Sequence, residues 1–145
     1  MLWRWQHPWA PDPDCDAGTT RLFTDVPRAD AGCGPIEALA TAGIINGYPG
    51  PNDTLQFQPD DYVSRQGIAA FLSRLLGHAS ATCTGTTRKF TDVPSTNQFC
   101  GVIEWLAAQG VITGSENSDG TYSFHPVADA TRQAFSAFLY RANAL

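Results

Sequence analysis

The sequence contains no hydrophobic run of the roughly 18 or more residues that a helix needs to cross a lipid bilayer, so we expect no membrane insertion. It is also poor in basic residues, with 9 lysines and arginines against 14 aspartates and glutamates and a formal net charge of −5. Proteins that bind nucleic acids usually carry a basic patch and a high isoelectric point. The charge balance therefore argues against a nucleic-acid partner.

Lysine is nearly absent, because Lys89 is the one lysine among the 9 basic residues. Arginine suits the bidentate recognition of carboxylate or phosphate groups. Genomic base composition produces the same bias and is the favoured explanation, so the arginine content alone identifies no ligand.

Common catalytic and metal-binding patterns are missing as well. The sequence has neither a G-x-S-x-G nucleophile motif nor a glycine-rich phosphate loop. His7, His78 and His125 have no neighbour at metal-ligand spacing, so we interpret them as surface histidines. We expect no metal site and no cofactor.

One segment is similar to part of an EF-hand calcium loop. In residues 115–126, SENSDGTYSFHP, Asn117 and Asp119 have suitable spacing. Ser115 stands in place of the first acidic ligand, however, and Pro126 in place of the closing glutamate. The segment is interpreted as an ordinary turn rich in Asn, Asp and Gly.

The chain is 145 residues long and 43% hydrophobic, which suits one ordinary domain or a few small repeats with a common core. Its N-terminal segment, MLWRWQHPWAPDPD (1–14), lacks the apolar region and cleavage site of a secretory signal. We expect any export signal to lie upstream.

An internal repeat organises the chain. A shift of 67 positions superimposes two long stretches without a gap, and nearly half of the aligned residues are identical. The aligned pairs are GTTRLFTDVP (18–27) with GTTRKFTDVP (85–94), CGPIEALATAGIINGY (33–48) with CGVIEWLAAQGVITGS (100–115), and VSRQGIAAFLSR (63–74) with ATRQAFSAFLYR (130–141).

The repeat predicts the domain organisation. MLWRW (1–5) matches the end of each copy, so residues 1–17 are interpreted as the tail of a preceding repeat plus a linker. Residues 18–78 and 79–145 then form one repeat each.

Each copy is predicted to fold as helix, loop and helix, which gives a mostly α fold with little strand. Ile36, Leu39 and Ala40 recur at the i, i+3 and i+4 spacing of one buried helix face, as do their equivalents in the second copy. Gly43 and Gly110 stand where a helix is expected to end in a left-handed residue.

The second helix of each copy is expected to begin after Ser64 or Thr131, both good N-cap residues. Phe57 and Phe124, two residues before a proline, are expected to hold the preceding loops on the core.

The cysteines Cys15, Cys33, Cys83 and Cys100 are even in number and form no C-x-x-C pair, which favours disulfides over zinc and allows three pairings. Cys33 and Cys100 are equivalent, and Cys15 and Cys83 nearly so. Since like should pair with like, we expect Cys15–Cys33 and Cys83–Cys100, each adding about 3 kcal/mol.

Each copy also carries a pair of carboxylates, Asp25 with Glu37 and Asp92 with Glu104. A catalytic pair would need its own asymmetric surroundings, and a duplicated pair argues against one. The aspartates are expected to cap turns and the glutamates to be solvated on a helix face or to form salt bridges there. We expect no catalytic residues and no enzymatic activity.

Trp105 has only Ala38 at the equivalent position of the first copy. It could pack between repeats or offer a flat surface to a sugar, and the packing role is favoured.

Arg65 and Arg132 directly follow the predicted N-caps, where the helix dipole disfavours a cation by roughly 0.3–1 kcal/mol. One explanation is a small carboxylate site formed by the hydroxyl, the arginine and the free backbone N–H groups. The other is an internal partner, either an acidic side chain such as Asp25 or Asp92 or a phenylalanine ring. The residues themselves do not decide between the two.

The ordered set of motifs resembles the S-layer homology domain. It comprises FTDVP, an I-E-x-L-A helix, GIINGY or GVITGS, F-x-P, and VSRQG or ATRQA leading into AFLxR. The cysteines and the R-Q dipeptide resemble the variant of this domain that is found in secreted actinobacterial proteins. The resemblance implies a pseudo-threefold arrangement of three repeats, whose grooves bind a secondary cell-wall polysaccharide that often carries pyruvate ketals.

The resemblance also assigns roles to residues. The family's T-R-A-E motif uses its arginine to contact the acidic sugar, which implies that role for Arg65 and Arg132, with Ser64 and Thr131 beside them.

The chain departs from that motif at its last letter, because Gly67 and Ala134 stand where the glutamate of a capping box would be. Gln66 and Gln133 are expected to supply replacement hydrogen bonds to the ligand.

The sequence therefore predicts a non-catalytic module that anchors a secreted protein at the cell surface or cell wall. Its partner would be an acidic, in some cases pyruvylated, cell-wall polysaccharide. The alternative is a structural self-assembly or protein-interaction module of a cell-surface protein, which binds no glycan and packs against neighbouring chains or an upstream repeat.

Overall fold

The structure is a computed structural model of the chain. It describes residues 15, 21–78, 82–83 and 88–145. The expected remnant of a preceding repeat, residues 1–17, lies outside the described residues except for Cys15.

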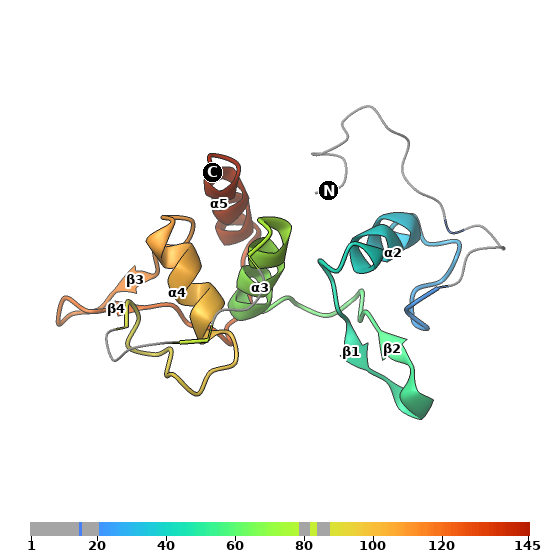
Figure 1. The fold of residues 1–145 in the computed structure, drawn as a ribbon, viewed down its shortest axis with the longest axis horizontal. Coiled ribbons are helices and arrows are strands. Elements are labelled where there is room, and N and C mark those ends of the chain that lie inside the picture. The colour runs from blue at the N-terminus through green and yellow to red at the C-terminus, as the bar shows by residue number, and fades with distance from the viewer. Residues whose placement is uncertain (1–14, 16–20, 79–81, 84–87) are drawn as a thin grey trace. The chain divides into compact units, whose positions relative to one another are not determined.

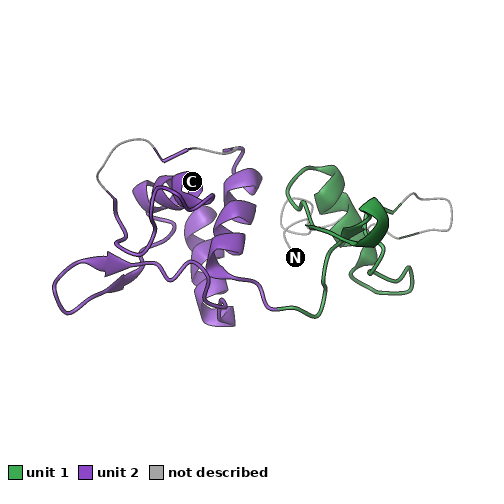
Figure 2. Cartoon of the chain, turned by 90° about the horizontal axis from the view of Figure 1, so that it is seen from below, with its two compact units in different colours: residues 1–61 green, residues 62–145 purple. Residues whose placement is uncertain are grey.

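The chain forms two compact units, residues 1–61 (unit 1) and residues 62–145 (unit 2), shown in Figure 2. The boundary falls inside the first sequence repeat, before its second helix. The second helix of the first copy therefore packs with the second copy, so the repeat in the sequence and the unit of packing differ.

Unit 1 contains one α-helix and a short hairpin among its described residues (Figure 1). In the hairpin, Tyr48 pairs with Gln56 and Pro49 with Leu55, in antiparallel register. Phe23 of the FTDVP segment forms a parallel bridge with Leu55. The elements are α2 (Cys33–Thr41), β1 (Tyr48–Pro49), the 3-10 turn η1 (Pro51–Asp53) and β2 (Leu55–Gln56).

Unit 2 contains three helices and a second hairpin, and α3 packs against both α4 and α5 (Figure 1). Ser115 pairs with Ser123 and Glu116 with Tyr122. The predicted mostly helical fold with little strand is confirmed for the described residues. The elements are α3 (Arg65–Leu75), α4 (Cys100–Ala108), β3 (Ser115–Glu116), β4 (Tyr122–Ser123) and α5 (Arg132–Ala142).

The helices end and begin where the sequence predicts. Gly43 and Gly110, with φ of 72° and 74°, follow the C-caps of α2 and α4 in the left-handed region. The Ser64 hydroxyl accepts a hydrogen bond from the backbone N–H of residue 67 at 3.2 Å, and the Thr131 hydroxyl accepts one from that of residue 134 at 3.1 Å. The N-caps therefore work without the glutamate of a capping box.

The two units differ in the size of their cores. Unit 2 buries a large cluster of aliphatic and aromatic side chains, because α3 packs against both α4 and α5. The buried cluster of unit 1 consists of Cys15, Phe23, Val26 and Cys33. Both cysteines of the first disulfide belong to this cluster, so among the described residues of unit 1 the cross-link is part of the core.

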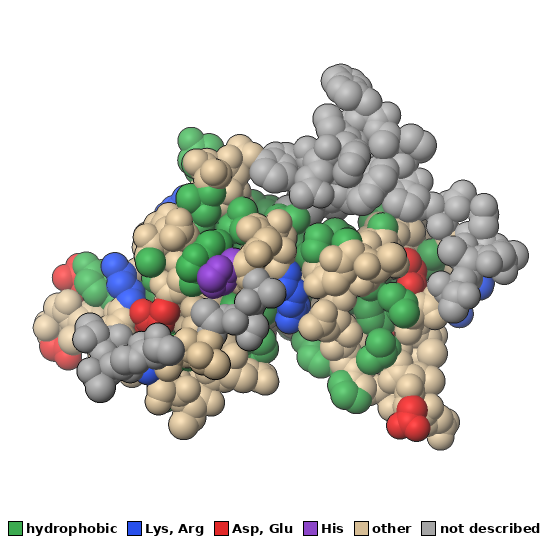
Figure 3. Space-filling model, in the orientation of Figure 1, with side chains coloured by type: hydrophobic (Ala, Val, Ile, Leu, Met, Phe, Trp, Pro, Cys, Tyr) green, Lys and Arg blue, Asp and Glu red, His purple; other side chains and the backbone are tan. Residues whose placement is uncertain are grey.

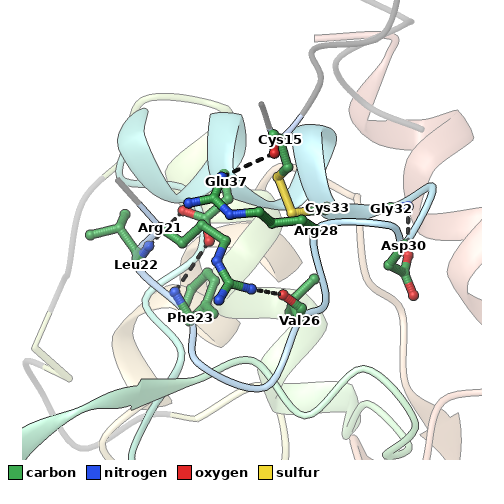
Figure 4. Close-up of a disulfide and its surroundings, with 10 residues drawn as sticks. All are labelled: Cys15, Arg21, Leu22, Phe23, Val26, Arg28, Asp30, Gly32, Cys33 and Glu37. Carbon is green, nitrogen blue, oxygen red and sulfur yellow. Dashed lines mark hydrogen bonds between the residues drawn. A yellow bond between two sulfur atoms is a disulfide. The ribbon is translucent and has the colours of Figure 1, made fainter. Parts of the chain in front are cut away.

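Both predicted disulfides are confirmed. Cys15 is bonded to Cys33, with their Cα atoms 5.9 Å apart, and Cys83 to Cys100, with a separation of 5.5 Å. Both separations are typical of disulfides. Each bridge ties the segment before an FTDVP motif to the first residue of a helix, as Figure 4 shows for the first copy.

The glutamates of the I-E-x-L-A helices correct one expectation. Glu37 is not solvated on its helix face, because its carboxylate accepts hydrogen bonds from the backbone N–H groups of Leu22 at 2.8 Å and Phe23 at 3.2 Å (Figure 4). Glu104 accepts from the N–H of Lys89 at 3.0 and 3.1 Å. The reason is that these N–H groups, at the start of the FTDVP motif or directly before it, have no acceptor in a regular sheet.

None of the helices among the described residues has the length and hydrophobicity needed to cross a membrane.

Two glycines of unit 2 provide a test of the loop that follows α4. A Cβ at Gly114 (φ 68°) would lie 2.7 Å from the carbonyl oxygen of Ser123 and would collide with the ring of Phe90. A Cβ at Gly110 (φ 74°) would meet nothing within 4 Å. Gly110→Ala should therefore cost only the left-handed backbone penalty of about 1–2 kcal/mol, and Gly114→Ala clearly more. Urea unfolding of the two variants measures the difference, and equal losses would contradict this packing.

Candidate functional site

The aspartate of the FTDVP motif closes a loop in each copy. In unit 1 the Asp25 carboxylate accepts hydrogen bonds from the backbone N–H groups of Phe57 at 2.8 Å and Gln58 at 2.7 Å. Residues 58–61 form a turn, in which the N–H of Asp61 donates to the carbonyl oxygen of Gln58. Asp25 therefore caps a turn as expected, although the turn lies 32 and 33 residues away in the sequence.

Ionisation of Asp25 is favoured by this arrangement. Partial burial opposes the charge, but the hydrogen bonds from Phe57 and Gln58 outweigh it and lower the pKa of the Asp25 carboxyl below its usual value.

The second copy repeats the arrangement. The Asp92 carboxylate accepts from the N–H groups of Phe124 at 2.8 Å and His125 at 2.7 Å. Gln58 and His125 both adopt left-handed backbone conformations, with φ of 60° and 57°. This unusual conformation turns two successive N–H groups toward one carboxylate, and it fixes where the carbonyl group of the preceding phenylalanine points.

Arg65, the first residue of α3, lies on the second of these loops. Its Nε donates a hydrogen bond to the carbonyl oxygen of Phe124 at 2.6 Å. Its guanidinium carbon lies 4.8 Å from the ring centroid of Phe124 and 5.3 Å from that of Phe138. These contacts offset the unfavourable position of a cation at a helix N-terminus. Arg65 therefore has an internal partner in a phenylalanine, as one of the two explanations expected.

Partial burial also lowers the pKa of the Arg65 guanidinium, while the charge of Asp92 acts in the opposite direction. Arginine stays charged under either influence, so Arg65 is a permanent cation held against the loop.

The start of α3 is further joined to this loop by backbone hydrogen bonds. The N–H of Arg65 donates to the carbonyl oxygen of Ala128 at 2.9 Å, and that of Gln66 to Pro126 at 2.8 Å. These N–H groups are among those expected to be free for an anion. In α3 they already have acceptors.

The side chains of Gln66 and Gln133, the two glutamines predicted to contact the ligand, differ in their hydrogen bonding. The side-chain oxygen of Gln66 accepts a hydrogen bond from the amide of Asn97 at 3.1 Å, which fixes the orientation of the Gln66 side chain. Arg132 and Gln133, at the start of α5, are exposed, and neither their side chains nor their backbone N–H groups have a hydrogen-bond partner among the residues that the structure describes. The arginine and glutamine at the start of α3 thus contact other parts of the protein, and those at the start of α5 are exposed.

Trp105 is not placed beside Arg65. Its ring stacks on that of His78, with centroids 4.0 Å apart and an interplanar angle of 2°. His78 follows the last turn of α3, whereas Arg65 opens that helix, and an 11-residue helix is about 16 Å long. Trp105 packs against the core of unit 2, which supports the packing role.

His78 also corrects the reading of the histidines as surface residues. It is half-buried, and its Nε2 atom is buried without a hydrogen-bond partner. His78 is half-buried because the indole of Trp105 covers one face of its imidazole ring.

The segment that is similar to a calcium loop forms a turn. Asp119 accepts hydrogen bonds from the N–H of Thr121 at 3.0 Å and from its hydroxyl at 2.6 Å. Within the described residues, no group of three or more His, Cys, Asp or Glu side chains could hold a metal ion.

The engaged and open arginines should differ in their effect on stability. Arg65→Gln removes a hydrogen bond from a charged donor and two ring contacts, so we expect a loss of about 2 kcal/mol. Arg132→Gln, at the exposed equivalent position, should change stability by less than about 0.5 kcal/mol. Chemical denaturation of both variants measures this. A loss at Arg132 as large as that at Arg65 would contradict the structure.

The lowered pKa of Asp25 predicts a dependence of stability on pH. The contribution of the ionised carboxylate is complete above the unfolded pKa of about 3.9, and it is lost as the pH falls through the lower folded value. Asp25→Asn should therefore reduce stability at neutral pH and weaken the loss of stability on acidification below about pH 4.

Thermal unfolding across this pH range tests the effect. Asp60→Asn, at an exposed position of the same unit, is the control. An acid dependence that Asp25→Asn leaves unchanged would count against the role of these bonds.

The comparison with known families agrees with the arrangement of the two copies. The profile of the S-layer homology domain matches residues 22–66 and 89–135, one match in each copy. No curated protein matches the chain. The S-layer homology domain is a family of non-catalytic modules that anchor proteins to the cell wall and bind cell-wall polymers. Since the two matches cover more than half of the sequence, with their motifs in the same order, this chain belongs to the S-layer homology domain family.

Proposed function

We propose that this chain holds a secreted protein on the cell surface by binding an acidic polysaccharide of the cell wall. Arg65 and Arg132 provide the cationic contacts in this proposal, and no step is catalytic. The disulfides support an oxidising location, because such bonds persist outside the cytoplasm.

The geometry of Arg65 carries the proposal. Its Nε atom is used to hold the side chain on the carbonyl group of Phe124. Its two Nη atoms form no hydrogen bond among the residues that the structure describes. A guanidinium that is fixed through Nε presents its outer edge in one orientation, and that edge matches a carboxylate such as the one of a pyruvate ketal.

Gln66 contributes to the same place. Its side-chain oxygen accepts a hydrogen bond from Asn97, so an amide group is held in one orientation at the residue that follows Arg65. A sugar hydroxyl can donate to or accept from such an amide. The pair supplies one contact for the acid and one for the sugar ring, which is how a glycan is distinguished from a simple anion.

Arg132 offers a second contact of another kind. With Thr131 as the N-cap, the N–H groups of Arg132 and Gln133 have no acceptor among the described residues. A carboxylate at this point would be favoured both by the guanidinium and by the positive end of the helix dipole. Because the chain carries a net charge of −5, an acidic polymer is repelled by most of its surface. Such a polymer can bind only where local groups are positive, as at Arg65 and Arg132.

Binding to purified cell-wall sacculi tests the proposal. We expect the wild-type chain to sediment with sacculi, Arg132→Gln to weaken this binding several-fold, and Arg65→Gln/Arg132→Gln to abolish it. Lys89→Gln, which removes one positive charge outside α3 and α5, is the matched control and should bind normally. Removing the acidic substituents from the polymer should release the wild-type chain.

Two results would overturn the proposal. One is undiminished sedimentation of the double variant, provided that circular dichroism shows it to be folded. The other is equal binding to sacculi with and without the acidic substituents, which would mean that neither arginine reads a carboxylate.

A further inference from the structure

Asn97 lies in the turn that leads into α4, and the oxygen and nitrogen of its side-chain amide have different partners. The Oδ1 atom accepts a hydrogen bond from the backbone N–H of Phe99 at 2.7 Å, which closes the turn. The Nδ2 atom donates to the side-chain oxygen of Gln66 at 3.1 Å. One amide group therefore connects the start of α4 to the start of α3.

The first copy shows that the turn itself does not need an amide. Asp30 stands at the position equivalent to Asn97, and its carboxylate accepts from the N–H of Gly32 at 2.6 Å. The carbonyl oxygen of each residue also accepts from the first N–H of the following helix, that of Cys33 at 3.0 Å and that of Cys100 at 2.9 Å. The hydrogen bond to α3 is different, because it needs an N–H donor, which an ionised carboxylate lacks.

The bond from Asn97 sets the orientation of the Gln66 amide. A side-chain amide is planar and carries an acceptor oxygen on one side and an NH₂ donor group on the other. Because Oε1 of Gln66 faces Asn97, Nε2 faces away, and it has no hydrogen-bond partner among the described residues. Within the same part of the chain, the buried polar side-chain atom without a partner is Nε2 of His78. The N–H groups of Gln66 are therefore accessible to solvent.

Arg65, the preceding residue, is fixed in a similar manner. Its Nε atom donates to the carbonyl oxygen of Phe124, which leaves the two Nη atoms for a ligand. Two successive residues thus present donors whose orientation is set by other parts of unit 2. Donors of this kind suit a ligand that carries acceptors, as a carboxylated sugar does.

The orientation of these donors matters because the chain has no excess of positive charge to hold an acidic polymer. Its net charge is −5. On the face of the molecule shown in Figure 3, the basic side chains lie in small separate groups. Affinity for an acidic ligand therefore depends on individual donors and on the direction in which they point.

We propose that Asn97 is a positioning residue for glycan binding, which acts by turning the N–H groups of Gln66 toward the ligand. Arg65 binds the carboxylate, and Gln66 donates to an oxygen atom of the same polysaccharide. The proposal rests on the glycan binding proposed above and narrows the role of Gln66 in it, because the amide donates to the glycan and does not accept from it.

The start of α5 lacks this arrangement. Gln133 is equivalent to Gln66, and its side chain has no hydrogen-bond partner among the residues that the structure describes. Its amide can present either the oxygen or the N–H groups. Selection for an acceptor on the glycan is therefore a property of α3.

Calorimetric titration of the full chain, with its disulfides intact, by the acidic polysaccharide released from sacculi tests the role of Asn97. Asn97→Asp keeps the oxygen that closes the turn, as Asp30 does in the first copy, and replaces the donor to Gln66 by an acceptor. The Gln66 amide then turns its N–H groups inward, and the affinity should fall about tenfold. Gln98→Glu adds the same charge at the exposed next residue, so it is the matched control and should change the affinity much less.

A second substitution distinguishes positioning from a general structural effect. Gln66→Met removes the amide and should lower the affinity about as much as Asn97→Asp does. If Asn97 acts through Gln66, Asn97→Asp should have no further effect on the affinity of the Gln66→Met variant. Circular dichroism checks that each variant is folded, and Gln66→Met, which leaves the turn before α4 untouched, tests the proposal alone if Asn97→Asp does not fold.

The outcomes separate this proposal from the one on which it rests. Unchanged affinity of the folded Asn97→Asp or Gln66→Met variant would overturn the role of Asn97 and leave that of the arginines intact. An equal loss in Gln98→Glu would do the same, because charge would then explain the effect, and so would additive losses in the double variant. A wild-type chain that does not bind the polysaccharide would instead overturn glycan binding itself.

Discussion

The packing of α3 on α4 is the contact on which unit 2 depends. It places the second helix of one repeat over the first helix of the next, and it buries Leu72 against Ile103 and Leu106 in one core. Arg65 fixes the end of α3 on the Phe124 loop, and Asp92 holds that loop in the shape that receives it. The sequence repeat is therefore not the unit of packing, since the second copy completes its core with α3, a helix of the first copy.

The elements of the fold follow from local sequence signals. Ser64 and Thr131 are N-caps, and Gly43 and Gly110 end their helices, because hydroxyl groups and left-handed glycines satisfy helix ends without help from distant residues. The disulfide pairing followed from the repeat, because equivalent positions must pair alike. Each of these depends on residues close in the sequence or on the symmetry of the repeat.

The tertiary roles of polar residues could not be predicted in the same way. Asp25 and Glu37 looked like a turn cap and a solvated helix residue, and both bind backbone N–H groups of distant segments. The difference between Arg65 and Arg132 was equally hidden, because their local sequences are nearly identical and the contacts of Arg65 are with Phe124, a residue far away in the sequence. The R-Q motif shows that both copies have an arginine at this position. Only the tertiary contacts show which nitrogen atoms of each arginine form hydrogen bonds within the protein.

The disulfides also bear on how an anchor carries a mechanical load. A pull along the chain that reaches Cys15 passes through the sulfur atoms directly into the start of α2 at Cys33, 18 residues further on. The Cys83–Cys100 disulfide provides the same covalent bypass to the start of α4. The FTDVP segments, with their aspartates and loop contacts, lie inside the two bypassed loops and are shielded from tension. The carboxylates of Asp25 and Asp92 thus lie off the covalent path that carries tension through the two disulfides.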